Sequence, residues 1–171
     1  SETEETLEER EIRRVLARSG EAGHVDVAEV EMIERVFDLD DTIVREVMVP
    51  RPDVTTLSAA DTIETAREAV LDSGHTRYPV VAADEPDQVL GQLDVKDLFR
   101  ASEAGPEDRL VGDLAREILI VPETTPINEL LLQFRDEQQQ MAAVIDEWGA
   151  FEGLATVEDV VEAVVGDLRD E

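Results

Sequence analysis

The sequence predicts an α+β protein in which two β-α-β-β-α units form a body with pseudo-twofold symmetry, preceded by a helical N-terminal arm. Short segments of the first half recur in the same order in the second half. Each half runs in the order extended stretch, capped helix, two short strands and amphipathic helix. With only 4% aromatic residues, the core must consist mainly of Val, Leu, Ile and Ala. The 171 residues suffice for two small units that share a core.

The first 42 residues predict the helical arm. Residues 5–18 have apolar positions at helical spacing, and Gly20 is a typical stop. A second helix is expected to begin at Asp26, with Glu29 reaching back in a capping box.

The repeat begins after the arm. Its positions differ by 67 at the start (44 and 111) and by 62 at the end (91 and 153), because the loops differ in length. The matched pairs are VREVM (44–48) with VGDLA (111–115), TIETA (62–66) with PINEL (126–130), HTRYPVV (75–81) with QQQMAAV (138–144), and GQLDVKDLF (91–99) with GLATVEDVV (153–161).

In the first unit, predicted for residues 43–103, an extended stretch leads to a helix. We expect Asp61 and Glu64 to cap this helix and Gly74 to end it. Two strands, YPVVAA (78–83) and VLGQLD (89–94), and a final helix follow.

The second unit, predicted for residues 110–171, repeats this order. The extended stretch is 118–121, and the strands are AAVIDE (142–147) and FEGLA (151–155), with a turn at Trp148–Gly149. We expect the sheets to pack against helices in one body. The Ser-, Glu-, Gly- and Pro-containing stretch 101–108 is expected to join the units.

The chain is strongly acidic, with a formal net charge of −28. Such a surface repels phosphate backbones, so we expect no nucleic-acid partner. The acidic residues are spread along the chain, which favours a solvation role in concentrated salt, as in halophilic proteins. A surface for divalent cations is the alternative interpretation.

Several function classes lack a sequence signal. The chain has no cysteine, which excludes disulfides and thiolate metal sites. It has no P-loop, nucleophile elbow or histidine-carboxylate metal spacing, so we do not expect an enzyme or a metal site. No apolar run approaches the roughly 18 residues of a membrane span, and we expect a soluble protein.

The duplicated unit, with each copy closing on Gly-x-x-x-x-x-Asp before a helix, resembles a tandem pair of cystathionine-β-synthase (CBS) domains, a Bateman module. The leading stretch 6–54 and the closing stretch 144–171 resemble the CorC-like branch, which includes magnesium and cobalt efflux proteins and cyclin-M transporters. In that branch a membrane-embedded domain precedes the arm. The resemblance therefore implies a regulatory part of a membrane protein, on the cytoplasmic face of the cell membrane.

The resemblance also implies a nucleotide site. CBS pairs typically bind adenosine-containing ligands between the two units, and the family pattern Gly-x-x-Thr/Ser-x-x-Asp matches Gly153, Thr156 and Asp159. The Thr is expected to meet phosphate and the Asp the ribose. In the transporter branch, the acid at Glu158 and a Thr-Arg-x-Pro element, here Thr76, Arg77 and Pro79, also tend to line the ATP site. Tyr78 and Thr55 complete the candidate residues.

Each candidate also has a purely structural interpretation. Thr156 and Asp159 form a capping box, although a helix start also attracts anions. Arg77 is either a phosphate ligand or the partner of nearby acids. Tyr78 either stacks on adenine or fills the core. We interpret His24 and His75 as incidental.

The two copies differ where a phosphate would bind. The first copy has Asp94 in place of the threonine, and its negative charge would repel phosphate. We therefore expect one nucleotide site, in the second copy. The ligand is expected to be ATP or another adenine nucleotide, with MgATP as our hypothesis because Mg²⁺ offsets the repulsion.

The leading functional hypothesis is a module that senses adenine nucleotide and controls an attached ion-transport domain of the Mg²⁺/Co²⁺ type. Its expected partners are a second copy, in a homodimer, and the membrane domain of the parent chain. The alternative is a structural dimerisation module whose clefts are vestigial.

Overall fold

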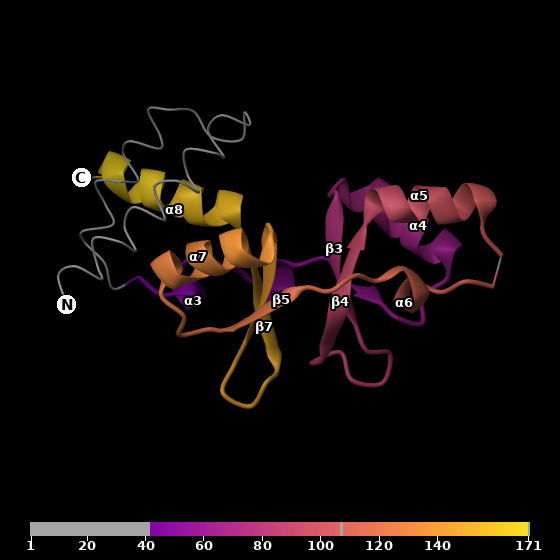
Figure 1. Ribbon diagram of the computed structural model, residues 1–171, viewed down its shortest axis with the longest axis horizontal. Helices are drawn as coiled ribbons and strands as arrows, with labels where there is room; N and C mark the ends of the chain where they lie inside the picture. Colours follow the sequence, from indigo (N-terminus) through magenta and orange to yellow (C-terminus); the bar gives the residue numbers. More distant parts are fainter. Residues whose placement is uncertain (1–41, 107, 171) are drawn as a thin grey trace.

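The computed structural model describes residues 42–106 and 108–170 (Figure 1). The helices expected at 5–18 and after Asp26 lie outside the described residues. The described chain contains the two predicted β-α-β-β-α units, and the predicted fold class is confirmed. The first unit comprises β2 (Leu57–Ser58), α4 (Ile63–Ser73), β3 (Arg77–Val81), β4 (Val89–Asp94) and α5 (Val95–Ala104). The second comprises β5 (Leu119–Pro122), α7 (Ile127–Glu137), β6 (Met141–Ile145), β7 (Phe151–Thr156) and α8 (Val157–Asp170).

Short elements precede each unit. Before the first unit lie α3 (Val44–Val47), β1 (Val49–Pro50) and the 3-10 turn η1 (Arg51–Asp53). Before the second lies α6 (Val111–Leu114). The segments 44–48 and 111–115 were recognisable as repeats in the sequence, but the two short helices within them were not predicted. Each of the two helices is tied at its start by an acidic side chain: Glu46 accepts from the amide of Ile43, and Asp113 from that of Leu110.

The start of α4 differs from the prediction. Thr62, not Asp61, is the N-cap, and its hydroxyl accepts from the amide of Thr65 at 3.1 Å. The Asp61 carboxylate instead accepts from the amide of Ser58 at 2.9 Å, which closes the turn before the helix. Gly74 ends α4 as predicted, at φ 75°.

The predicted joint 101–108 is also shorter than expected, because α5 continues to Ala104. Asp94 begins this helix by accepting from the amide of Lys96 at 2.8 Å. The helix buries Leu98 and Ala101, so its apolar stripe carries it into the stretch that composition alone marked as a linker.

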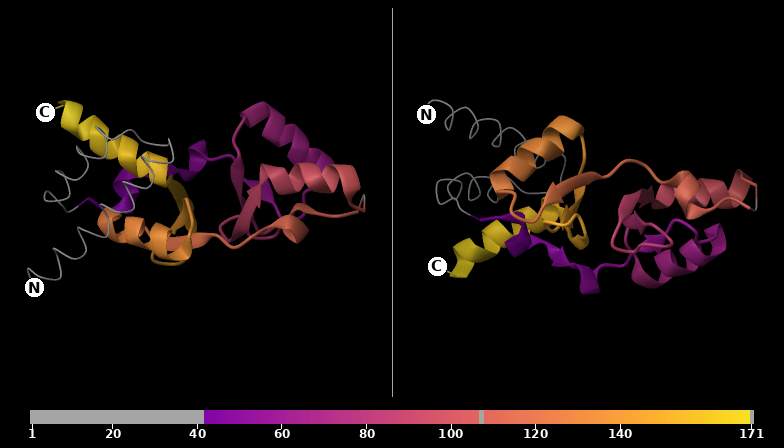
Figure 2. Two further views of the ribbon diagram at one scale, coloured as in Figure 1. Left: turned by 45° about the horizontal axis from the view of Figure 1, so that its top comes forward. Right: turned by 90° about the horizontal axis from the view of Figure 1, so that it is seen from below.

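The sheets form the centre of the molecule, and the long helices lie toward its two ends (Figures 1 and 2). The orders are β2-β3-β4 and β1-β7-β6-β5. In both units the first strand is parallel to the second, and the second is antiparallel to the third. As expected, the sheets pack against helices: α7 and α8 share a buried core with the second sheet, and α4 and α5 share one with the first. Side chains of the two sheets also share a buried cluster, formed by Val81, Val89, Ala143 and Phe151.

The leading segments are exchanged between the units. The strand β1 precedes the first unit but pairs with β7 of the second, and Val44 of α3 lies fully buried in the second unit's core. Conversely, Val111 of α6 precedes the second unit but is fully buried in the core of the first. The amides of Val44 and Val111 donate to Thr125 O and Asp61 O in the opposite unit. Each core is therefore completed by a segment that the chain order assigns to its neighbour.

Candidate functional site

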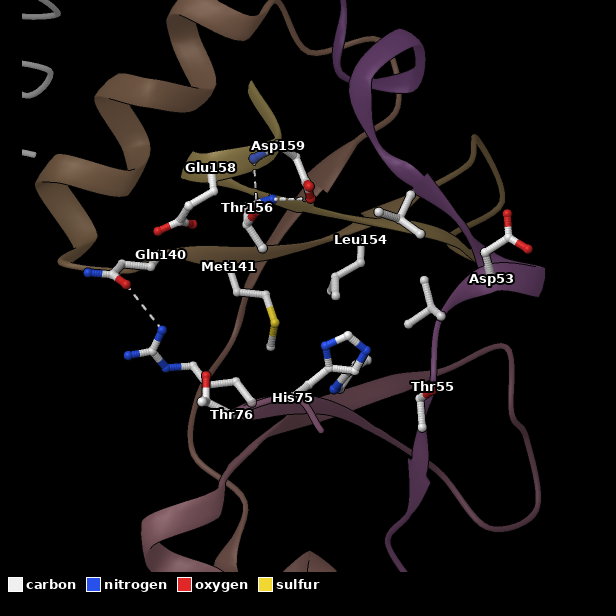
Figure 3. Close-up of a pocket in the computed structure, with 14 residues that line it drawn as sticks. Asp53, Thr55, His75, Thr76, Gln140, Met141, Leu154, Thr156, Glu158 and Asp159 are labelled. Carbon is white, nitrogen blue, oxygen red and sulfur yellow. Dashed lines mark hydrogen bonds between the residues drawn. The ribbon is translucent and has the colours of Figure 1, made fainter. Parts of the chain in front are cut away.

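A cavity of about 500 Å³ lies between the units (Figure 3). This volume falls within the range typical of small-molecule sites. Residues before and within β3 form one side, and the start of β6, the end of β7 and the start of α8 form the other. The segment from β1 through η1 to Thr55 completes the wall.

The cavity brings together seven of the nine candidate residues. Those that line it are Thr55, Thr76, Arg77, Pro79, Thr156, Glu158 and Asp159. They come from three segments more than 20 residues apart in the sequence, so the fold is what gathers them. Whether they bind a nucleotide stays a prediction.

The remaining two candidates do not line the cavity. Tyr78 is fully buried in the first unit's core, and its hydroxyl lies 2.7 Å from that of Ser73. Of its two interpretations, the structure supports the core one.

Gly153 serves the approach of another strand, not of a ligand. A Cβ at this position would lie 2.5 Å from Met48 Sδ and 2.6 Å from Val49 O, because β1 and the residue before it lie directly beside it. At Gly91, its counterpart in the first unit, a Cβ would likewise lie 2.5 Å from Arg116 O. The repeated glycine therefore has a packing reason: the exchanged segment passes where a side chain would stand.

The start of α8 forms one polar end of the cavity. The Thr156 hydroxyl accepts from the amide of Asp159 at 3.0 Å, and the Asp159 carboxylate accepts from the amide of Thr156 at 3.2 Å. This is the predicted capping box. The amide of Val157 donates to Gln140 O. Two of the first three helical amides, those of Val157 and Asp159, are thus already engaged, and fewer are free for an anion than the sequence suggested.

Groups that can bind an anion nevertheless remain at the end of the cavity where α8 begins. A hydroxyl that accepts one hydrogen bond keeps its own hydrogen for donation, so Thr156 can still donate to a phosphate oxygen. The positive end of the α8 dipole points to the same place. Across the cavity, Arg77 Nη1 donates to Gln140 Oε1 at 3.1 Å (Figure 3).

The rest of the wall is largely apolar. Its apolar side chains are those of Val49, Val54, Pro79, Met141 and Leu154. An apolar surface of this kind suits a flat aromatic ring, such as a nucleotide base. The polar and apolar parts together have the amphipathic character of a nucleotide. The carboxylates of Asp53, Glu158 and Asp159 also line the cavity, whereas Arg77 supplies its one guanidinium among the described residues. A polyphosphate entering here meets excess negative charge.

His75, which we interpreted as incidental from its sequence context, has a place in the site. His75 lines the cavity and its ring points toward Leu154 (Figure 3). It also meets the ring of Tyr78 edge-on, with centroids 5.9 Å apart. Its position directly before Thr76 is the signal that could have identified it, because neighbours of a candidate residue at a strand start share its location.

Gln140 and Met141 were also missed as lining residues. They are the repeat counterparts of Arg77 and Tyr78, since the second copy is offset by 63 (138 − 75) in this segment. Tyr78 turns into the core, whereas Met141 lines the cavity, so equivalent positions do not have equivalent roles.

At the corresponding place in the first unit, the protein's own polar side chains pair with one another. Asp97, the counterpart of Asp159, holds Arg116 in a bidentate pair, with Nε and Nη2 at 2.7 and 2.8 Å. This hydrogen bonding raises the pKa of Arg116. Beside it, Gln92 donates from Nε2 to Glu117 O and Gln139 Oε1. The polar groups that a ligand would need are already paired with each other.

No helix among the described residues is both long enough and apolar enough to cross a bilayer. Likewise, within 42–106 and 108–170 no three acidic or histidine side chains converge in a geometry that could hold a metal ion.

Comparison with known proteins gives consistent results. The family model described as "CBS domain" matches residues 44–104 and 111–166. The magnesium and cobalt efflux protein CorC of Escherichia coli is 34% identical over 161 residues, covering 94% of this chain and 55% of that protein. The UPF0053 protein YugS of Bacillus subtilis is 34% identical over 165 residues, covering 96% of this chain and 38% of its own length. The chain thus spans about half or less of these relatives.

Two solved structures extend the comparison. The CBS domain of the bacterial CNNM/CorC family Mg²⁺ transporter is similar with a TM-score of 0.72 and 32% identity, covering 92% of this chain and 95% of that one. The same kind of domain in complex with ATP is similar with a TM-score of 0.72 and 33% identity, covering 81% and 98% of the two chains.

Proposed function

The chain belongs to the CBS-domain family, as a tandem pair of the kind found in CorC relatives, and on this basis we propose that it is a regulatory module that binds an adenine nucleotide in the cavity between its units. The observation that supports this most is the placement of Thr156, at the α8 N-terminus, in one cavity with Arg77. The ATP complex of a related CBS domain supports the choice of ligand.

The proposed orientation follows the polarity of the walls. The base lies against the apolar side chains, including Val54 and Leu154, and the ribose hydroxyls meet Asp159. The phosphates lie between the Thr156 hydroxyl and Arg77, whose guanidinium can donate two parallel hydrogen bonds. These residues act by binding and positioning, and the proposal includes no reaction.

We propose that Mg²⁺ accompanies the phosphates. In the described part of the chain, the cavity is lined by three carboxylates, those of Asp53, Glu158 and Asp159, and by the guanidinium of Arg77, so free ATP would add charge to an anionic site. A cation on the phosphates lowers that repulsion without needing a protein ligand. Titration calorimetry with and without Mg²⁺ tests this, and equal ATP affinity in both conditions would reject it.

Thr156 allows a test of the nucleotide site that preserves the fold. Aspartate caps helices at least as well as threonine, as Asp94 does in the first unit. Thr156→Asp should therefore keep the melting temperature within a few degrees of the wild type while weakening ATP binding by at least about tenfold, because it places a carboxylate against phosphate. Thr156→Ser, which keeps the hydroxyl, is the matched control and should bind nearly as the wild type does.

A second candidate function also has an observation in its favour. The capping box uses both Thr156 and Asp159, so these residues have a structural purpose without any ligand. The chain would then be a dimerisation module. Absence of adenine nucleotide binding by the folded wild type would favour this alternative.

The parent protein's role is a further part of the proposal. Relatives that this chain covers in part include magnesium and cobalt efflux proteins, so we propose that nucleotide binding biases an attached membrane transport domain from its cytoplasmic side. We also propose a homodimer as the working unit. Analytical ultracentrifugation with and without ATP would measure both the dimer and its linkage to the ligand.

A further inference from the structure

Asp94 lies outside the cavity but contacts Arg77, the arginine that lines it among residues 42–106 and 108–170. It stands opposite Arg77 in the antiparallel register of β3 and β4, and its Oδ2 lies 3.9 Å from Arg77 Nε. On the other side of the guanidinium, Nη1 donates to Gln140 Oε1 at 3.1 Å. Arg77 and Gln140 line the cavity, and Asp94 does not. The guanidinium is thus shared between an acid of the first unit and an amide of the second.

We propose that Asp94 sets how strongly the cavity holds phosphate, by acting on Arg77. This inference rests on the proposed nucleotide site and adds a specificity-determining residue to it. The carboxylate offsets part of the arginine's positive charge, and a phosphate must compete with it for the guanidinium. Because the base and ribose do not contact Arg77 in the proposed orientation, the effect falls on the phosphates alone.

The Asp94 carboxylate lies close enough to Arg77 to compete with a phosphate for its guanidinium, but it binds the guanidinium only weakly. The Arg77 and Asp94 side chains are 42% and 27% exposed, and their closest contact is 3.9 Å. A half-exposed pair at this distance is weak, so a polyphosphate can displace it. Asp94 is also anchored independently of Arg77, because its Oδ1 caps α5 through the amide of Lys96. The carboxylate therefore stays in place when a ligand takes the arginine.

Asp94 thereby has two separable properties, a capping oxygen and a charge. Asparagine keeps an oxygen acceptor for the cap and is as good an N-cap as aspartate. Asp94→Asn therefore removes the charge beside Arg77 and leaves the start of α5 intact. Glu103→Gln is the matched control, since it removes one charge from an exposed position near the other end of the same helix.

The experiment measures ATP and adenosine affinities by titration calorimetry, with Mg²⁺ held constant, for the wild type and both variants. We expect Asp94→Asn to bind ATP about three- to tenfold more tightly, with adenosine affinity unchanged and with Glu103→Gln like the wild type. Equal changes for ATP and adenosine, or no change for either, would overturn the inference. A wild type that binds neither ATP nor any other adenine nucleotide would refute the proposed function itself.

A double-mutant cycle tests whether Asp94 affects ATP binding through Arg77. Arg77→Ala is expected to weaken ATP binding, and Asp94→Asn in that background should no longer strengthen it. An undiminished gain in the absence of Arg77 would show that Asp94 repels phosphate directly, which contradicts the proposed route. Thermal unfolding of each variant separates these effects from loss of the fold.

Discussion

Glu152 on β7 lies beside Asp146, at the hairpin that joins β6 to β7. Asp146 accepts from the amides of Trp148 and Ala150, and this hydrogen bonding, that from Ala150 first, lowers its pKa. Burial, followed by the negative charge of Asp146, raises the pKa of Glu152 above its ordinary value of 4.5. The protein thus favours the charged form of Asp146 and disfavours the charged form of Glu152.

The raised pKa of Glu152 predicts that Glu152→Gln increases thermal stability in a pH-dependent way. A carboxyl whose pKa is raised by folding stabilises the protein below its unfolded pKa, and this contribution is lost as the pH rises through the folded pKa. At pH 7 the wild type holds the unfavourable charge and the glutamine variant does not. We expect the variant to melt about 1–2 °C higher at pH 7, with the difference closing below about pH 4.5.

Thermal melts across this pH range check the prediction, with Glu147→Gln as the control. Glu147 is exposed in the same hairpin, so its removal changes the net charge equally. A difference that persists unchanged at acid pH, or that the control reproduces, would contradict the explanation.

Residue-scale prediction from the sequence succeeded where the chemistry is local. The capping box of Thr156 and Asp159 spans three residues, and its hydrogen bonds follow from spacing alone. Thr62 displaced Asp61 as a cap because both residue types suit the position and only the turn geometry decides. Tyr78 is buried and His75 faces the cavity. Which of these side chains faces the second unit depends on how the two units pack, and residue spacing alone does not predict that packing.

At the scale of elements, β1 shows why a two-residue strand matters. It pairs Val49 with Leu154 and Pro50 with Gly153, and so covers the edge of β7. Val49 and Leu154 also line the cavity. Sequence periodicity cannot identify so short a strand, and the similarity of VREVM to VGDLA gave no indication that these segments cross to the opposite units.

The close approach of β1 predicts the effect of Gly153→Ala. The added methyl would meet Val49 O at 2.6 Å, and this backbone oxygen cannot move without shifting the strand. We expect a destabilisation of about 1–3 kcal/mol, measured by denaturant unfolding, and weaker ATP binding because Val49 moves.

Gly112→Ala is the comparison for this substitution. Its methyl would stand 3.1 Å from Ala59 O and Ala59 Cβ, which is a milder contact. A smaller loss is therefore expected, without an effect on ATP. Equal losses for both variants would argue against the crossing strand as the cause.

At the scale of the whole molecule, the net charge of −28 is the dominant physical property. Raising KCl from about 0.1 M to about 1 M shortens the Debye length from about 10 Å to about 3 Å, which screens repulsion between acids on the same surface. If the acids serve solvation in salt, the melting temperature should rise by about 10 °C or more over this range, and helical circular dichroism should weaken at low salt.

Magnesium chloride at matched ionic strength distinguishes the two interpretations of the acidic surface. Equal stabilisation by both salts indicates screening. A much larger effect of MgCl₂ than of KCl at the same ionic strength would favour a surface for divalent cations. Retention of full structure at low salt would contradict the solvation role.

The repeat, the order of elements and the fold class were all readable from the sequence, because each unit carries its own pattern of apolar residues and turns. The arrangement of the units was not. Sheets that face each other through Val81, Val89, Ala143 and Phe151 look the same in sequence as strands that pack on helices. The pairing of Arg116 with Asp97 in the first unit likewise depends on a contact between residues 19 positions apart.

The exchange of leading segments bears on how this duplicated gene could have arisen and how it can be divided. A product ending after α5 would lack α6, which supplies Val111 to its core. A product beginning at α6 would lack β1 and leave the backbone of β7 open to pairing with other chains, a known route to aggregation. A single repeat on its own would meet both needs only by exchanging leading segments with an identical copy.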